Sequence, residues 1–133
     1  MNSLMDHETH LFVYGTLRKP MHDPLHRLLE TEGKLVTTGT FQGKLYDLGR
    51  YPGAVPSRGK NDRTLGEIYR LREPQRVFKI LDAYEGRRFK RQQVTILQEE
   101  KKTITAWIYL YVGSVKGHPL IPSGDYVQHR NAL

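Results

Sequence analysis

The chain has 133 residues, no cysteine, and a formal net charge of +7 from 21 Lys and Arg against 14 Asp and Glu. This is the length of one ordinary domain, and the missing cysteine excludes disulfides, thiolate metal sites and cysteine nucleophiles. The apolar runs are too short to span a bilayer, and the polar start is not typical of a signal peptide. We therefore expect one cytoplasmic domain over residues 1–133, with a flexible N-terminal segment over residues 1–9.

The first part of the chain predicts a strand, a helix and a long strand. Residues 10–14 (HLFVY) form an apolar run that ends at Gly15, which is typical of a buried strand followed by a tight turn. Leucines between Pro24 and Gly33 share one helical face, so a short helix is expected there. Residues 34–48 are rich in strand formers, and the glycines among them indicate bulges or bends of a curved sheet.

The second part predicts a strand, a helix and a strand pair. Residues 64–71 (TLGEIYRL) alternate as a strand that carries one carboxylate among apolar neighbours. Residues 73–84 predict the clearest helix, because their apolar side chains repeat at helical spacing behind an early proline. Residues 92–98 and 103–112 predict an antiparallel pair around a short turn.

The remaining segments predict loops. Residues 49–63 and the last twenty residues are rich in Gly and Pro and are expected to be irregular, apart from a brief strand at residues 54–55. Strands outnumber helices and are separated mostly by turns, which favours an α+β fold with a curved, mainly antiparallel sheet and a few flanking helices. Closure into a small β-barrel is compatible with this number of strands, although spacing alone does not establish it.

Glu85 is the residue that periodicity singles out for proton transfer. It directly follows the apolar stripe of the predicted helix, and Gly86 lies at the C-terminal cap position, where glycine is typical. The negative end of the helix dipole disfavours a charged carboxylate there, and burial against strand aromatics would raise its pKa further. From the pattern alone, an exposed helix-end residue is the simpler interpretation.

Two other segments are candidates for a binding site. After a buried strand, Gly15 can turn the backbone N–H groups of its neighbours into one concavity that binds a carboxylate or an oxyanion, although a plain β-turn explains the pattern more simply. Tyr109 lies on an aromatic strand face, which is usually core, yet a buried hydroxyl needs a partner and could hold a substrate. The pair His22 and His26 lacks a third ligand, so no metal site is expected.

Read in order, these pieces resemble the γ-glutamylcyclotransferase-like family, including the AIG2-like proteins and the γ-glutamylamine cyclotransferases. The resemblance is carried by FVYGTLR at residues 12–18, YPG at 51–53, GEIY at 66–69, LDAYEG at 81–86, FKR at 89–91, AWIY at 106–109 and IPSGDY at 121–126. Phe89 departs from the pattern, because members often have a tyrosine there.

The resemblance implies the fold and the activity of that family. In the implied reaction, the α-amino group of a γ-glutamyl amide attacks the γ-carbonyl of the same molecule, which gives 5-oxoproline and releases an amine or amino acid. It implies Glu85 as the general acid/base of a transferase or lyase that needs no metal or cofactor. The residues implied at the substrate are Tyr14, Gly15, Thr16, Leu17 and Tyr109.

Alternatives remain open at this stage. A non-catalytic small-molecule-binding protein with the same fold is one, and the lost hydroxyl at Phe89 favours it. A nucleic-acid-associated protein is the other, but the basic residues are spread along the chain without a nucleic-acid motif, which favours a solvated surface. The resemblance implies a small-molecule γ-glutamyl substrate as the partner and leaves the leaving group and the oligomeric state open.

Overall fold

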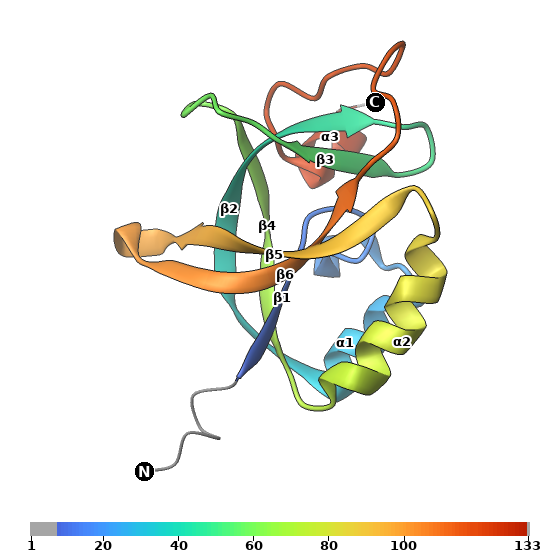
Figure 1. Ribbon diagram of the computed structural model, residues 1–133, viewed down its shortest axis with the longest axis vertical. Coiled ribbons are helices and arrows are strands. Elements are labelled where there is room, and N and C mark those ends of the chain that lie inside the picture. Colours follow the sequence, from blue (N-terminus) through green and yellow to red (C-terminus); the bar gives the residue numbers. More distant parts are fainter. Residues whose placement is uncertain (1–7, 133) are drawn as a thin grey trace.

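The computed structural model describes residues 8–132 and shows a curved sheet with helices at its sides and end (Figure 1). The strands are β1 Thr9–Val13, β2 Gly33–Asp47, β3 Pro52–Pro56, β4 Arg63–Leu71, β5 Phe89–Gln98 and β6 Thr103–Tyr111. The helices are α1 His26–Glu32, α2 Pro74–Glu85 and α3 Tyr126–Asn131, with short 3-10 turns at Lys19–Met21 and Glu99–Lys101. Most of the N-terminal segment predicted to be flexible, residues 1–7, lies outside the described residues, whereas Thr9 already begins β1.

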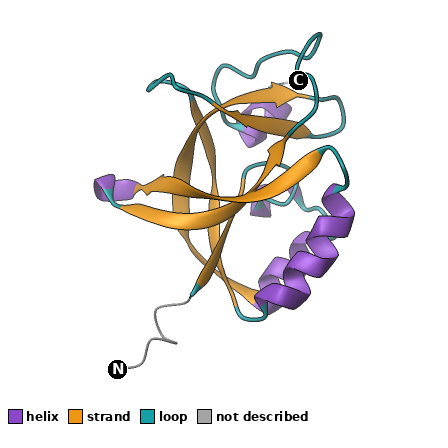
Figure 2. Cartoon of the chain, viewed as in Figure 1, coloured by secondary structure: helices purple, strands orange, loops and turns teal. Residues whose placement is uncertain are grey.

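Five of the strands close into a barrel. The strand order is β3-β2-β4-β1-β6-β5, and a further pairing of β2 with β5 joins the two ends of the row. Every neighbouring pair is antiparallel except β1 and β6, which run parallel. Figure 2 shows the strands wrapping around one another, with α1 and α2 together on one side and α3 near the opposite end. The predicted α+β class and mainly antiparallel barrel are therefore confirmed.

A close approach of β2 to β5 makes the closure. Gly39 pairs with Gln98, and a Cβ atom at Gly39 would lie 2.8 Å from the Ile96 side chain and 2.9 Å from the Leu97 carbonyl oxygen. The glycines of this strand are predicted to mark bulges or bends of a curved sheet. The one shift in register between β2 and β4 falls instead at residues 35–37, and Gly39 provides room for the neighbouring strand.

The core has two layers, because side chains alternate across the barrel wall. Inside the barrel lie Phe12, Tyr14, Phe41, Leu45, Ala54, Ile68, Ile96, Ala106, Ile108 and Leu110, with Ile121 and Tyr126. Between the wall and the helices lie Leu11, Val13, Leu17, Leu29, Tyr69, Leu71, Val77, Phe78, Leu81 and Tyr109. The apolar stripe predicted for α2 faces this second layer, so the packing fixes where the helix ends and where its last residue lies.

Two segments differ from the sequence prediction. Helix α3 lies in the C-terminal stretch that was expected to be irregular, and it begins where the Asp125 side chain accepts a hydrogen bond from the Gln128 backbone N–H at 3.2 Å. Strand β3 extends the brief strand predicted at residues 54–55 in both directions. Among the described residues, no helix is long and apolar enough to cross a membrane.

Candidate functional site

A cavity of about 220 Å³ opens where the end of β1, the end of α2 and the start of β3 meet. It brings together all six residues that the sequence singled out: Tyr14, Gly15, Thr16, Leu17, Glu85 and Tyr109. The rest of the wall is largely aromatic and apolar and consists of Phe12, Val13, Tyr51, Pro52, Tyr84 and Phe89. A carboxyl group and a backbone turn are therefore the main polar features facing this space.

Glu85 is the last residue of α2, and Gly86 ends the helix with a φ of 75° and an N–H bond to the Asp82 carbonyl. Burial is the main cause that raises the pKa of Glu85 to about 7, and the nearby carboxylate of Asp23 raises it further. A carboxyl group with this pKa exchanges its proton readily at neutral pH. The expected direction of the shift holds, and the structure adds Asp23 as a cause that sequence reasoning missed.

Asp23 reaches the site from the segment before α1. Its carboxylate accepts hydrogen bonds from the Leu25 backbone N–H at 2.8 Å and from the Tyr84 hydroxyl at 3.1 Å. Both partners are neutral donors, so the negative charge of Asp23 is not cancelled by them and acts on Glu85. No periodicity or motif in the sequence indicated this residue, because it lies in an irregular segment.

The turn after β1 offers unpaired backbone donors. The Arg18 N–H bonds to the Gly15 carbonyl at 3.1 Å and closes the turn. Within residues 8–132, none of the hydrogen bonds uses the backbone N–H of Gly15, Thr16 or Leu17. All three residues line the cavity, and backbone N–H groups without a protein partner are the kind of donor that binds a carboxylate or an oxyanion.

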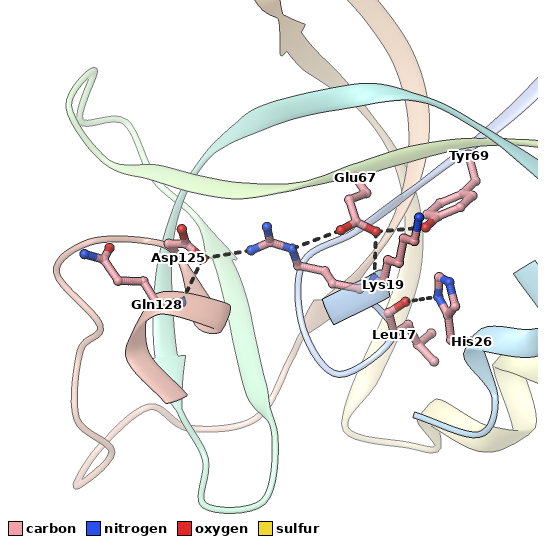
Figure 3. Close-up of polar contacts among 8 residues, drawn as sticks. Leu17, Lys19, His26, Glu67, Tyr69, Asp125 and Gln128 are labelled. Atoms are coloured by element: carbon pink, nitrogen blue, oxygen red, sulfur yellow. Dashed lines mark hydrogen bonds and ion pairs between the residues drawn. The ribbon is translucent and has the colours of Figure 1, made fainter. Parts of the chain in front are cut away.

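Behind this turn lies a buried polar cluster, shown in Figure 3. The Leu17 carbonyl accepts a hydrogen bond from Nδ1 of His26 at 2.7 Å, so that ring nitrogen carries the proton. The Lys19 backbone N–H donates to Glu67 at 2.9 Å. Nδ1 of His26 is thus occupied by a hydrogen bond to the backbone. In the described part of the chain, no group of three or more His, Cys, Asp or Glu residues is placed to hold a metal.

The two tyrosines of the cavity wall are bound to protein partners. The Tyr14 hydroxyl donates to the Tyr109 backbone carbonyl and accepts from the Ala54 N–H. The Tyr109 hydroxyl donates to Asp82, which also pairs with Arg91. Burial raises the pKa of both hydroxyls, so they stay protonated at neutral pH. Their side chains shape the cavity and hold its walls together.

Sequence patterns did not predict the other walls of the cavity. Phe89 packs against Tyr51 and Tyr111, with ring centroids 5.8 and 5.6 Å apart, and forms an apolar wall. Tyr84 lies beside Glu85 and is half exposed. Tyr51 and Phe89 belong to motifs that carried the family resemblance, but no spacing rule brings residues so far apart in the chain to one cavity.

Known proteins are similar to this chain over nearly its whole length. The family described as "Gamma-glutamyl cyclotransferase, AIG2-like" matches residues 11–128. A "Putative gamma-glutamylcyclotransferase" of Vibrio cholerae is 36% identical over 122 residues, which cover 89% of this chain and 95% of the relative.

Two solved structures share the fold. The solution structure of ytfP from Escherichia coli is 32% identical with a TM-score of 0.65, over 92% of this chain and 99% of that one. The crystal structure of an aig2-like protein from Mus musculus has a TM-score of 0.70 at 22% identity, over 87% of each chain. At that identity the mouse protein supports the fold alone.

Proposed function

Because the chain belongs to the Gamma-glutamyl cyclotransferase, AIG2-like family, we propose that it cyclises a γ-glutamyl amide to 5-oxoproline and releases the amine or amino acid. The observation that carries this proposal is the carboxyl group of Glu85, with a pKa of about 7, in the same cavity as three unpaired backbone N–H groups. Proton transfer and anion binding are the two tasks that such a cyclisation requires.

In this mechanism the nucleophile belongs to the substrate. The ionised Glu85 carboxylate takes a proton from the substrate α-ammonium group, and the freed amine attacks the γ-carbonyl carbon. The new C–N bond closes the five-membered ring and places the negative charge on the carbonyl oxygen. When the tetrahedral intermediate collapses, Glu85 gives this proton to the leaving nitrogen as its bond to carbon breaks. The ring nitrogen still carries one proton more than a lactam does, so the Glu85 carboxylate takes that proton and passes it to the released amine, which leaves as an ammonium ion. Because the attack is intramolecular, no protein nucleophile is needed.

The turn at Gly15, Thr16 and Leu17 would bind the negative charge. Its N–H groups can hold the α-carboxylate of the glutamyl unit or the oxyanion of the intermediate. An acceptor held by fixed backbone dipoles needs no reorganisation during the reaction. Tyr14 and Tyr109 serve as walls that fold the glutamyl chain towards Glu85, since their hydroxyls already have protein partners.

The size of the cavity favours a small buried group. Its volume of about 220 Å³ is below the range of roughly 300–1,000 Å³ that encloses drug-sized ligands. A glutamyl unit suits this space, and the leaving amine would extend towards the mouth beside the half-exposed Tyr84. A cytoplasmic location and a small-molecule γ-glutamyl substrate as the partner are part of this proposal.

The test is to incubate the purified protein with γ-glutamyl amides that carry different leaving groups and to measure 5-oxoproline. The panel should include amino acids, an ε-lysyl amine and a polyamine. Product that requires the folded protein would support the proposal, and the preferred leaving group would define the substrate. Binding of these compounds without any 5-oxoproline would favour a non-catalytic binding protein of the same fold.

A further inference from the structure

Glu67 is a buried carboxylate that the proposed mechanism does not use. It lies in the middle of β4 and is only 5% exposed. One oxygen accepts hydrogen bonds from the Lys19 backbone N–H at 2.9 Å and from the Tyr69 hydroxyl at 2.8 Å. The other lies 3.7 Å from Nε of Arg18. Figure 3 shows Glu67 between Tyr69 and the segment that carries Lys19.

Burying a carboxylate costs free energy unless hydrogen bonds and charges compensate it. The groups that compensate Glu67 therefore indicate which segment of the chain it fixes in place. Two of them, Arg18 and Lys19, directly follow the turn at residues 15–17 whose N–H groups are unpaired in the cavity. We propose that Glu67 is a positioning residue, which fixes this turn from behind so that its N–H groups stay directed at an anion in the cavity. The inference rests on the proposed function for the identity of that anion, a substrate carboxylate or oxyanion.

The contact between Arg18 and Glu67 is one of charge. Nε of Arg18 is buried and makes no hydrogen bond among the described residues, although the Glu67 carboxylate faces it. The other end of the guanidinium donates to Asp125 at 2.9 Å. Arg18 is therefore held between two carboxylates, one on the barrel wall and one at the start of α3. The chain direction after the turn is fixed by these contacts and by the Lys19 N–H.

The rest of the turn is fixed by hydrogen bonds. His26 on α1 holds the Leu17 carbonyl, and the Tyr14 hydroxyl is bound between β6 and β3. The donors at residues 15–17 thus lie between rigid anchors on both sides. A binding turn that is already ordered loses less entropy when the anion arrives, so each anchor contributes to affinity without touching the ligand.

The sharpest test removes one hydrogen bond of Glu67 and leaves the carboxylate in place. Lys19→Pro deletes the N–H that donates to Glu67. Arg18 has φ −65° and ψ 146°, a conformation allowed before proline, and Lys19 opens a 3-10 turn where proline is tolerated. Lys19→Ala is the matched reference, because it loses the same ammonium group and keeps the N–H. The ligand is 5-oxoproline. Its affinity is measured by calorimetry, and its contact with the turn is measured by the NMR shifts of the Gly15, Thr16 and Leu17 amides.

We expect Lys19→Pro to bind 5-oxoproline about tenfold more weakly than Lys19→Ala, as loss of a hydrogen bond to a charged group implies. The three amides should also exchange faster in the free Lys19→Pro protein. Equal affinity and equal exchange in the two variants would overturn the inference. Wild-type protein whose three amides do not respond to 5-oxoproline would overturn it too, because the turn would then have no anion to position.

A second variant tests the carboxylate itself. Glu67→Gln keeps the shape and removes the charge that faces Arg18. The reference is Glu32→Gln, which removes a partly buried carboxylate that pairs with the exposed Arg76 and does not line the cavity. Glu67→Gln should raise KM and lower 5-oxoproline affinity while the pH profile of kcat, which reports Glu85, keeps its midpoint. A change in that midpoint with unchanged affinity would contradict a positioning role. Wild-type protein that binds 5-oxoproline but forms none would remove the proposed function and leave this inference standing.

Discussion

The Tyr14 hydroxyl donates a hydrogen bond to the backbone carbonyl of Tyr109 at 2.6 Å, although the two residues are 95 positions apart in the chain. The same hydroxyl accepts from the Ala54 N–H at 3.1 Å. Three strands are thereby joined at one buried oxygen beside the cavity, since Tyr14 follows β1, Ala54 lies in β3 and Tyr109 lies in β6. The Tyr109 hydroxyl, by contrast, donates to the side chain of Asp82 and joins no further strand.

We therefore expect Tyr14→Phe to destabilise the protein more than Tyr109→Phe does. Tyr14→Phe leaves a buried carbonyl and a buried N–H without their partner, which costs about 1–3 kcal/mol of unfolding free energy. Tyr109→Phe leaves Asp82 still paired with Arg91 at a partly exposed site, so its cost should be about 1 kcal/mol or less. Urea unfolding of both variants checks the order, and the reverse order would contradict it.

Glu85→Gln should reduce kcat by at least about 100-fold, because general acid/base catalysis contributes that much or more. Gln keeps the size of the side chain and cannot exchange a proton, so KM should change little. Glu73→Gln at the other end of α2 is the control, since that side chain is exposed and makes no cap bond. Equal turnover in Glu85→Gln and the control would remove Glu85 from the mechanism.

The pH dependence of kcat should follow the ionisation of Glu85. The carboxylate must be ionised to accept the substrate proton, so kcat should rise with pH through a midpoint of about 7. Asp23→Asn should move this midpoint to lower pH, because it removes a negative charge. The single amide oxygen can still accept from the Leu25 N–H, and the amide NH2 group that replaces the other oxygen can donate to the Tyr84 hydroxyl oxygen. Burial, the larger cause, remains. An unmoved midpoint in Asp23→Asn would show that its charge does not reach Glu85.

The ionisation of Glu85 should also make the free energy of unfolding depend on pH. Its pKa is raised from 4.5 to about 7 in the folded state, so the folded protein binds more protons than the unfolded one between these values. The unfolding free energy of the wild type should thus fall by about 3 kcal/mol relative to Glu85→Gln as the pH rises from 4.5 to 7. Above about pH 8, where Glu85 is ionised in both the folded and the unfolded state, the difference should stay constant. Parallel curves for the two proteins across this range would refute the raised pKa.

Gly15→Ala should weaken ligand binding at the turn. A Cβ atom there would lie 2.8 Å from Cγ of Pro52, so either the turn or the start of β3 must move. Both line the cavity, and we expect the affinity for 5-oxoproline to fall by roughly tenfold, as displaced binding groups commonly cause. Urea unfolding measured in parallel separates this effect from a general loss of stability. Unchanged affinity would mean that the turn tolerates the added methyl group.

The elements that were predicted correctly are those whose sequence pattern lies within the element itself. Helix α2 could be predicted because its apolar stripe repeats at helical spacing and Gly86 follows it with a positive φ. The alternation over residues 64–71 likewise matched β4, whose side chains divide between the two core layers. In each case the residues that decide the structure lie within a few positions of one another.

The parts that were missed depend on contacts between distant segments. Helix α3 is short, and Asp125, which caps it, is also held by Arg18 more than one hundred positions earlier. The burial of Glu85 depends on a cavity whose walls include the start of β3, and its neighbour Asp23 comes from an irregular segment. The place of Glu85 on a helix and the family resemblance singled out this residue and the turn at residues 15–17, which share the cavity, but no local pattern indicated Asp23.

The parallel pairing of β1 with β6 has a consequence for how the protein is made. The strand that leads into the binding turn is among the first to leave the ribosome, and its parallel partner spans residues 103–111. Until those residues emerge, β1 can pair only with β4 and presents an open edge on its other side. Such distant pairings slow folding, and a nascent chain with an open edge is prone to aggregate. We therefore expect ribosome-bound chains that stop before β6 to recruit chaperones and to lack any ligand-binding activity.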